Sequence, residues 1–125
     1  MSPKRIFIVD DDEMMSQMLS DHLQKNPLNK VSSFGTGEEC ISKLGENPHA
    51  IILDYNLNMV EPNAADGLAI LQQVKKINRD ICVIMLSSQE HYGKALQTIA
   101  KGAIEYVVKD KDAFKKVDSI LNALP

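Results

Sequence analysis

The chain has 125 residues, of which 44% are hydrophobic and 25% are charged. This length and balance predict one folded domain over residues 1–125 and exclude a fibrous or disordered chain. The net charge of -3 argues against general attraction to nucleic acid or acidic lipid, so we expect neither as a partner.

The N-terminus carries no targeting signal that the sequence reveals. Lys4 and Arg5 are followed by only four apolar residues, fewer than a signal peptide or membrane helix needs. Cys40 and Cys82 are the only cysteines and have no CxxC spacing, which argues against a zinc or redox site. We expect a cytoplasmic protein with two reduced thiols and no membrane contact.

Short apolar runs alternate with stretches of helical periodicity. In chain order, strands are predicted at residues 6–9, 30–34, 50–53, 81–86 and 105–108. Five amphipathic helices are predicted over residues 15–23, 41–44, 68–77, 96–100 and 114–124, with their Met and Leu stripes in the core. This alternation predicts an α/β fold, a doubly wound five-stranded parallel sheet with helices on both faces.

Polar side chains follow four of the five predicted strands. In chain order these are Asp10 and Asp11, then Asp54, then Ser87 and Ser88, then Lys109. Ligands of open parallel sheets bind beyond the carboxyl ends of the strands, near the point where strand order reverses. In the flavodoxin-like strand order 2-1-3-4-5, the first and third strands are neighbours. All of these side chains would then meet in one crevice.

Three carboxylates, hydroxyls and one ammonium suit phosphoryl transfer to a carboxylate. Mg²⁺ binds one or two carboxylates together with waters and phosphate oxygens, so Asp10 and Asp11 are predicted magnesium ligands. Asp54 is predicted to be both a ligand and the nucleophile that forms an aspartyl phosphate. Ser87 would donate a hydrogen bond to one phosphoryl oxygen, and Lys109 would neutralise another.

Each of these residues also has a purely structural interpretation. The acidic run at residues 10–13 resembles a helix cap and first turn, and read alone it favours capping. Asp54 could be a turn residue, Ser87 and Ser88 a cap, and Lys109 a surface lysine. Their joint placement at four strand ends favours the site. Asp12 and Glu13 remain the predicted cap and first turn.

Five motifs carry a resemblance to a known family. The stretches IFIVDDDEMM, AIILDYN, DGLAIL, VIMLSS and KGAIEYVVK stand in the order and spacing of a response-regulator receiver domain. The chain therefore resembles this phosphoprotein domain of bacterial two-component signalling over essentially its whole length. The resemblance implies that Asp54 is the phosphoacceptor, that Asp10 and Asp11 hold Mg²⁺, and that the main-chain carbonyl of Asn56 completes the metal site.

The resemblance also implies a switch and a partner. Ser87 matches the switch hydroxyl, Tyr106 the switch aromatic and Lys109 the phosphate-pairing lysine. The phosphoryl group would come from a sensor histidine kinase or a histidine phosphotransfer protein in a phosphorelay. Phosphorylation would then change the face formed by the fourth helix, the fifth strand and the fifth helix, through which a homodimer is also expected. Such a domain catalyses only its own phosphorylation and dephosphorylation and is not a turnover enzyme.

Two departures from the family pattern stand beside the site. The family usually has a cis proline after the lysine, whereas this chain has Asp110. A cis bond without proline costs about 3 kcal/mol, so we expect either a trans bond with a rearranged loop or a strained bond. Twelve positions separate Asp54 from Asp66, against seven in the family. This long loop at residues 56–66 could cover the phosphate, slow dephosphorylation or contact the kinase. A tolerated surface insertion is the interpretation we favour, because extra loop length costs little.

Three other functions are alternatives to a receiver domain. A haloacid-dehalogenase-type phosphatase needs an aspartate where Asn56 stands. A dinucleotide site in FGTGEEC lacks its third glycine, which would stand at Cys40, and no P-loop lysine follows. A phosphorylation-independent docking module of receiver fold is the alternative that the sequence leaves open, although no acidic site residue is missing.

Overall fold

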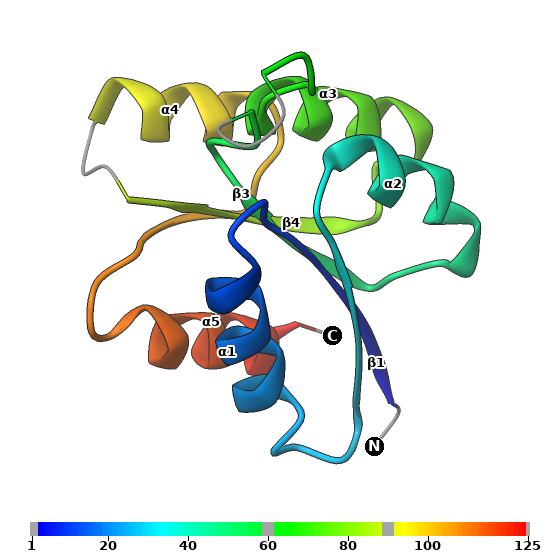
Figure 1. Cartoon of the computed structure of the whole chain (residues 1–125), viewed down its shortest axis with the longest axis vertical. Coiled ribbons are helices and arrows are strands. Elements are labelled where there is room, and N and C mark those ends of the chain that lie inside the picture. Colours follow the sequence, from blue (N-terminus) through cyan, green and yellow to red (C-terminus); the bar gives the residue numbers. More distant parts are fainter. Residues whose placement is uncertain (1–2, 59–61, 89–91, 125) are drawn as a thin grey trace.

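The computed structural model describes residues 3–58, 62–88 and 92–124 (Figure 1). The strands are β1 (Lys4–Val9), β2 (Asn29–Phe34), β3 (Ala50–Asp54), β4 (Cys82–Ser87) and β5 (Glu105–Val108). The helices are α1 (Glu13–Leu23), α2 (Gly37–Ser42), α3 (Gly67–Ile77), α4 (Tyr92–Ala100) and α5 (Ala113–Ala123), with a 3₁₀ turn at Leu44–Glu46. No helix among these is long and apolar enough to cross a membrane.

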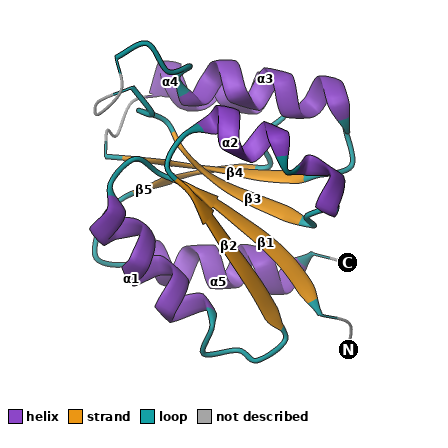
Figure 2. Ribbon diagram, turned by 45° about the vertical axis from the view of Figure 1, so that its right-hand side comes forward, coloured by secondary structure: helices purple, strands orange, loops and turns teal. Residues whose placement is uncertain are grey.

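All neighbouring strands are parallel, and they form one five-stranded sheet in the order β2-β1-β3-β4-β5. Helices α1 and α5 cover one face, and α2, α3 and α4 cover the other (Figure 2). The predicted doubly wound fold and strand order are therefore confirmed. The first strand begins two residues earlier than predicted, because Lys4 and Arg5 pair with Asn29 and Lys30 of the edge strand β2.

The apolar strand runs are buried on both sides of the sheet. In β1, Phe7 and Val9 belong to the core beneath α2 and α3, whereas Ile6 and Ile8 belong to the core beneath α1 and α5. The central strands β3 and β4 alternate in the same way. A strand that is buried on both faces has no room for polar side chains within it. The polar residues that follow each strand are therefore displaced to its carboxyl end.

Helix caps hold the chain where it leaves the sheet. The carboxylate of Asp12 accepts a hydrogen bond from the amide of Met15 at 3.2 Å and begins α1, as the sequence predicted. The carboxylate of Asp66 accepts a hydrogen bond from the amide of Ala69 at 2.9 Å and begins α3. Each cap satisfies an amide that the helix leaves unpaired, so α1 and α3 begin at defined points beside the sheet.

Gly67 lets α3 approach the end of β3 closely. The Gly67 amide donates a hydrogen bond to the Tyr55 carbonyl at 2.9 Å. A Cβ at this position would overlap with the Asp54 carbonyl oxygen and come within 2.8 Å of the Tyr55 Cα. Because these are backbone atoms, a side chain here would have to push β3 and α3 apart.

We predict that Gly67→Ala lowers the free energy of unfolding by about 1–3 kcal/mol, since it forces extra volume into a packed contact. Denaturant unfolding measures the change. Gly45→Ala is the matched control, because a Cβ at Gly45 meets no atom within 4 Å. Equal stability of the two variants would show that α3 and β3 are not in tight contact.

Candidate functional site

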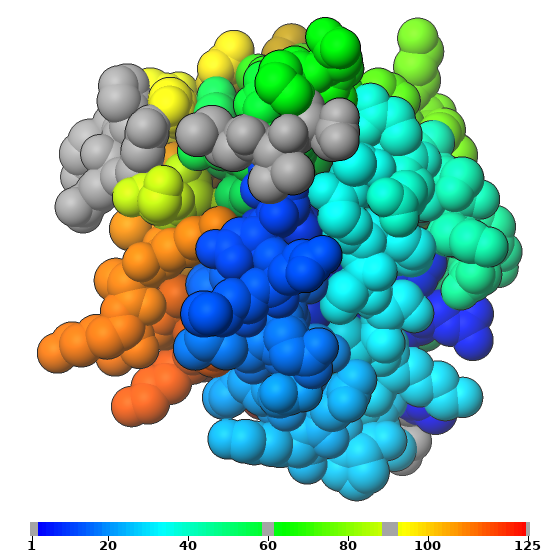
Figure 3. Space-filling view, viewed as in Figure 1, coloured from blue at the N-terminus to red at the C-terminus, as the bar shows by residue number. Residues whose placement is uncertain are grey.

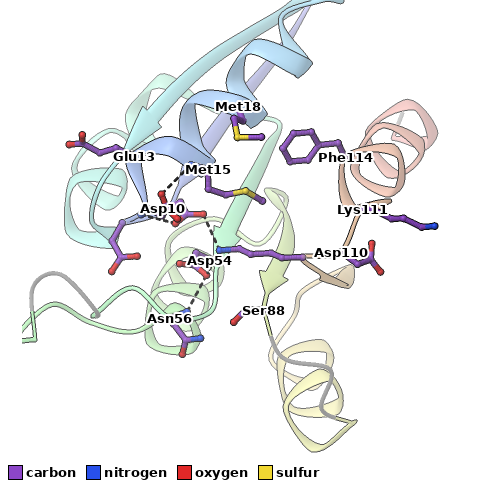
Figure 4. Close-up of a pocket in the computed structure, with 13 residues that line it drawn as sticks. Asp10, Glu13, Met15, Met18, Asp54, Asn56, Ser88, Asp110, Lys111 and Phe114 are labelled. Atoms are coloured by element: carbon purple, nitrogen blue, oxygen red, sulfur yellow. Dashed lines mark hydrogen bonds and ion pairs between the residues drawn. The ribbon is translucent and has the colours of Figure 1, made fainter.

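Strand register brings the predicted site residues together at one edge of the sheet. Val9 lies opposite Leu53, so Asp10, which directly follows β1, lies beside Asp54, the last residue of β3. The same edge carries a cleft of about 1220 Å³, lined on its polar side by Asp10, Asp11, Asp54, Asn56 and Lys109. Figure 4 shows Asp10 and Asp54 turned toward one another, with Asn56 and Ser88 beside them.

Three carboxylates form a compact acidic cluster in this cleft. Oxygen atoms of Asp10, Asp11 and Asp54 all lie within 4.8 Å of one another. Asp10 and Asp54 are each only 4% exposed, whereas Asp11 is half-buried. The Asp12 amide donates to Oδ1 of Asp10 at 2.9 Å, which orients that carboxylate. Buried like charges at this spacing repel one another unless a cation lies among them.

Lys109 supplies one positive charge to the cluster. Its Nζ lies 3.2 Å from Oδ2 of Asp10 and 3.2 Å from Oδ1 of Asp54. The lysine comes from the end of β5, two strands from β3 in the sheet, and its long side chain spans β4. Its main-chain amide donates to the Ser87 carbonyl at 2.7 Å, which holds the lysine backbone to the end of β4.

One ammonium does not balance the buried negative charge. Burial and the charge of Asp10 raise the pKa of Asp54 to about 7, although Lys109 and the Asn56 amide both act to lower it. Burial acts to lower the pKa of Lys109, but its two carboxylate partners outweigh burial and raise the pKa above the ordinary lysine value. The lysine is therefore charged at neutral pH, and the cluster retains an affinity for further positive charge.

The donor set fits a hard divalent cation. Carboxylate oxygens of Asp10, Asp11 and Asp54 lie close enough together to bind the same ion. Mg²⁺ prefers oxygen ligands of this kind. The Asn56 amide donates to Oδ1 of Asp54 at 3.3 Å, so Asn56 lies at the rim of the same site. The Asn56 carbonyl as a metal ligand stays a prediction.

Comparison with known proteins decides the family. The sequence matches the response regulator receiver domain family over residues 6–120. The chain belongs to this family. It is 28% identical over 121 residues to the chemotaxis protein CheY of Bacillus subtilis (strain 168), covering 96% of this chain and 97% of CheY.

Solved receiver structures share the fold of this receiver domain. The BeF3-activated DrrB receiver domain has a TM-score of 0.79 at 27% identity, covering 96% of this chain and 98% of that chain. A putative response regulator from Chloroflexus aurantiacus has a TM-score of 0.82 at 25% identity, covering 98% of both chains. Protein-glutamate methylesterase/protein-glutamine glutaminase 3 of Vibrio cholerae is also 33% identical over 108 residues, but the match spans only 28% of its length.

The predicted switch residues lie beside the cleft of the receiver domain rather than in its lining. Ser87 ends β4 and is fully buried, whereas the following residue, Ser88, is exposed and lines the cleft. Tyr106 lies on β5 and is half-buried against the core beneath α3 and α4. The roles of Ser87 and Tyr106 stay predictions.

The peptide bond between Lys109 and Asp110 is trans, so this receiver domain takes the first of the two forms expected from the missing proline. Asp110 builds the turn itself. Its amide donates to the Val108 carbonyl at 2.8 Å, and its carboxylate accepts from the Asp112 amide at 2.9 Å. The loop keeps Lys109 in reach of both carboxylates without a cis bond.

The long loop after β3 is anchored at both of its described ends. Leu57 is fully buried in the core, and the Ala65 amide donates to the Glu38 carboxylate of α2 at 3.0 Å. Residues 59–61 of this loop lie outside the described residues, so its expected tolerance as an insertion stays a prediction. No sequence pattern indicates the contact between Ala65 and Glu38, since the two residues are far apart in the chain.

The expectation that the apolar stripes of the helices lie in the core is wrong for parts of three helices. Ile77 of α3 is 59% exposed, and Leu96 and Ile99 of α4 are 70% and 45% exposed. The Met and Leu stripe of α1 was predicted to lie in the core, but Met18 is 53% exposed and lines the cleft with Met15 and Phe114. The start of α1, in blue, borders the orange surface of the β5–α5 region (Figure 3). A short helix on a sheet face buries only the side chains that point at the sheet, here Leu19 and Leu23.

We predict that Asp54→Asn stabilises the magnesium-free chain, and more so at high pH. The pKa of Asp54 rises from 3.8 to about 7 on folding, so the folded state loses stability as pH increases through that window. The gain of Asp54→Asn over wild type should be small at pH 4 and on the order of a few kcal/mol at pH 8.

Urea unfolding of both proteins across this pH range, in a chelator, measures the difference. Asp66→Asn is the control, because asparagine also caps a helix. A gain from Asp54→Asn that does not change between pH 4 and pH 8 would contradict the raised pKa.

Proposed function

We propose that this receiver domain is a phosphorylation switch whose acceptor is Asp54. The observation that carries the proposal is the geometry of one carboxylate. Asp54 is buried at the end of a central strand, and its carboxylate lies within 4.8 Å of the carboxylates of Asp10 and Asp11. It also forms an ion pair with Lys109 at 3.2 Å. A carboxylate held in this way can attack a phosphoryl group while nearby positive charge offsets the repulsion between the two anions.

Atoms of this chain account for the transfer. The Asn56 amide and Lys109 both donate to Oδ1 of Asp54, so we assign the attack to Oδ2. Oδ2 forms a bond to phosphorus as the bond from phosphorus to the histidine nitrogen of the donor breaks. The electron pair of that bond stays on the imidazole. Lys109 then pairs with a phosphoryl oxygen, since its flexible stem already lies between Asp10 and Asp54.

Asp10, Asp11 and Asp54, with the Asn56 carbonyl, would hold Mg²⁺ in this site. When bound, the ion neutralises charge on the carboxylates and on the phosphoryl oxygens. The fit of these residues rests on their convergence and on the raised pKa of Asp54, which both indicate negative charge that Lys109 alone does not balance.

The phosphoryl group would act as a switch through differential contacts. We propose that the Ser87 hydroxyl donates to a phosphoryl oxygen and that Tyr106 changes its packing in response. The surface formed by α4, β5 and α5 would then shift in population between two arrangements. Leu96 and Ile99 of α4 are 70% and 45% exposed, so this surface can offer apolar contacts to a partner.

The partner that fits this chemistry is a histidine-phosphorylated protein, either a sensor histidine kinase or a histidine phosphotransfer protein. A homodimer through the α4, β5 and α5 surface, a single domain over residues 1–125 and a cytoplasmic location are parts of the same proposal. The chain would catalyse its own phosphorylation and dephosphorylation only. The methylesterase relative gives no reason to propose esterase activity, because the match covers 28% of its length.

The direct test is phosphoryl uptake from a small phosphodonor in Mg²⁺, followed by intact mass spectrometry. We expect wild type to gain one phosphoryl group and Asp54→Asn to gain none, because the variant lacks the attacking oxygen. Asp66→Asn, an exposed helix cap on the neighbouring helix, is the matched control and should label as wild type does. Labelling of Asp54→Asn at the wild-type level would contradict Asp54 as the acceptor. No labelling of wild type would favour the docking module.

We predict that Mg²⁺ stabilises the wild type and that Asp10→Asn removes most of this effect. A ligand at a hundredfold excess over its dissociation constant adds about 2.7 kcal/mol to the free energy of unfolding. Asp12→Asn is the control, since Asp12 caps α1 and asparagine caps equally well. Thermal unfolding with and without Mg²⁺ gives the comparison. Equal stabilisation of the two variants by Mg²⁺ would show that the acidic residues 10–13 serve as a helix cap and not as a metal site.

A further inference from the structure

Tyr55 lies at a junction of the main chain beside Asp54. Its amide donates to the Leu86 carbonyl of β4 at 2.9 Å, and its carbonyl accepts from the Gly67 amide of α3 at 2.9 Å. Hydrogen bonds therefore hold the Tyr55 backbone to both β4 and α3. Tyr55 directly follows Asp54, the proposed acceptor. No loose linker separates Asp54 from the Tyr55 side chain, so the position of one is tied to the position of the other.

The Tyr55 ring contacts two elements of the proposed output surface. It meets the Tyr106 ring of β5 edge to face, with centroids 6.5 Å apart and planes at 73°. The Nζ of Lys94 in α4 lies 5.0 Å from the centroid of the same ring. Edge-to-face pairing and an ammonium near a ring are both favourable arrangements, and both depend on the position of the ring.

The Tyr55 side chain thus links the end of β3 to β5 and α4. Helices α3 and α4 lie on the same face of the sheet (Figure 2).

We propose that Tyr55 is a positioning residue that transmits the state of Asp54 to Tyr106 and to α4. This role rests on the proposed function and deepens it. Phosphorylation of Asp54 shifts the Tyr55 ring, which changes the edge contact with Tyr106 and the contact with Lys94 together. The two contacts give the two arrangements of the output surface different free energies, which is what a population shift requires.

The experiment follows Tyr106 by ¹⁹F NMR in the full chain labelled with 3-fluorotyrosine, before and after phosphorylation by a small phosphodonor in Mg²⁺. The chain has three tyrosines and no tryptophan, so the spectrum is simple, and Tyr→Phe variants assign it. Intact mass of the same samples reports phosphoryl uptake separately. The variants are Tyr55→Leu, which removes the ring, Tyr55→Phe, which keeps it, and Lys94→Met, which removes only the charge.

Phe34→Leu is the matched control. Phe34 meets Phe7 edge to face at 4.9 Å in the same core, so its loss removes a comparable aromatic pair far from α4. A merely structural effect of losing a core ring would appear equally in Phe34→Leu and Tyr55→Leu. Restoration of the response by Tyr55→Phe would show that the ring position is what matters.

We expect phosphorylation to displace the Tyr106 resonance in wild type, Tyr55→Phe and Phe34→Leu. In Tyr55→Leu and Lys94→Met the displacement should fall at least about twofold, although both chains still take up the phosphoryl group. A wild-type displacement in both of these variants would overturn the inference. If Tyr55→Leu fails to fold, Lys94→Met decides, because Lys94 does not line the cleft.

The two proposals fail in different ways. A wild type that gains no phosphoryl mass overturns the proposed function, and this inference falls with it. A wild type that gains the mass without any displacement of the Tyr106 resonance overturns the response of Tyr106 and the role of Tyr55, but leaves Asp54 as the acceptor. A wild-type displacement in both Tyr55→Leu and Lys94→Met overturns the role of Tyr55 alone.

Discussion

Two buried carboxylates lie at the ends of neighbouring parallel strands and repel one another. This repulsion is the constraint that the rest of the structure has to overcome. Asp10 and Asp54 are each 4% exposed, and oxygen atoms of both lie within 4.8 Å of Asp11 and of each other. Lys109 bridges Asp10 and Asp54 but does not fully balance their negative charge, which agrees with the raised pKa of Asp54. An uncompensated anionic site of this kind favours a metal cation and, with that cation, a phosphoryl group.

The rest of the fold maintains this cluster against its own repulsion. The apolar residues of β1 and β3 alternate between two cores, so neither strand can slip without exposing one face. Gly67 lets α3 pack against the end of β3, and Asp12 begins α1 directly after the acidic pair. The energy of core packing therefore holds the carboxylates in place. In the proposed coupling, the hydrogen bonds from the Tyr55 backbone to β4 and α3 transmit a change at Asp54 to Tyr55.

Once the common strand order 2-1-3-4-5 was assumed, the meeting of Asp10, Asp54 and Lys109 followed from the sequence, because apolar runs and strand ends obey short-range rules. The packing of side chains from different elements could not be predicted from the sequence. Tyr55 stands in the motif AIILDYN, but its contacts with Tyr106 and Lys94 bring together residues from three elements and leave no local pattern. The exposure of Met18 was missed for the same reason, since helical spacing cannot tell how much of a stripe the sheet covers.

The most direct test of the central claim is to locate the phosphoryl group on the chain. Borohydride reduction of the phosphorylated protein converts an aspartyl phosphate to homoserine, and peptide mapping by mass spectrometry then identifies the position. The account predicts homoserine at position 54 and unchanged aspartate at positions 10 and 11. Homoserine at position 10 or 11, or a phosphoryl group that resists reduction because it lies on Ser88, would contradict it.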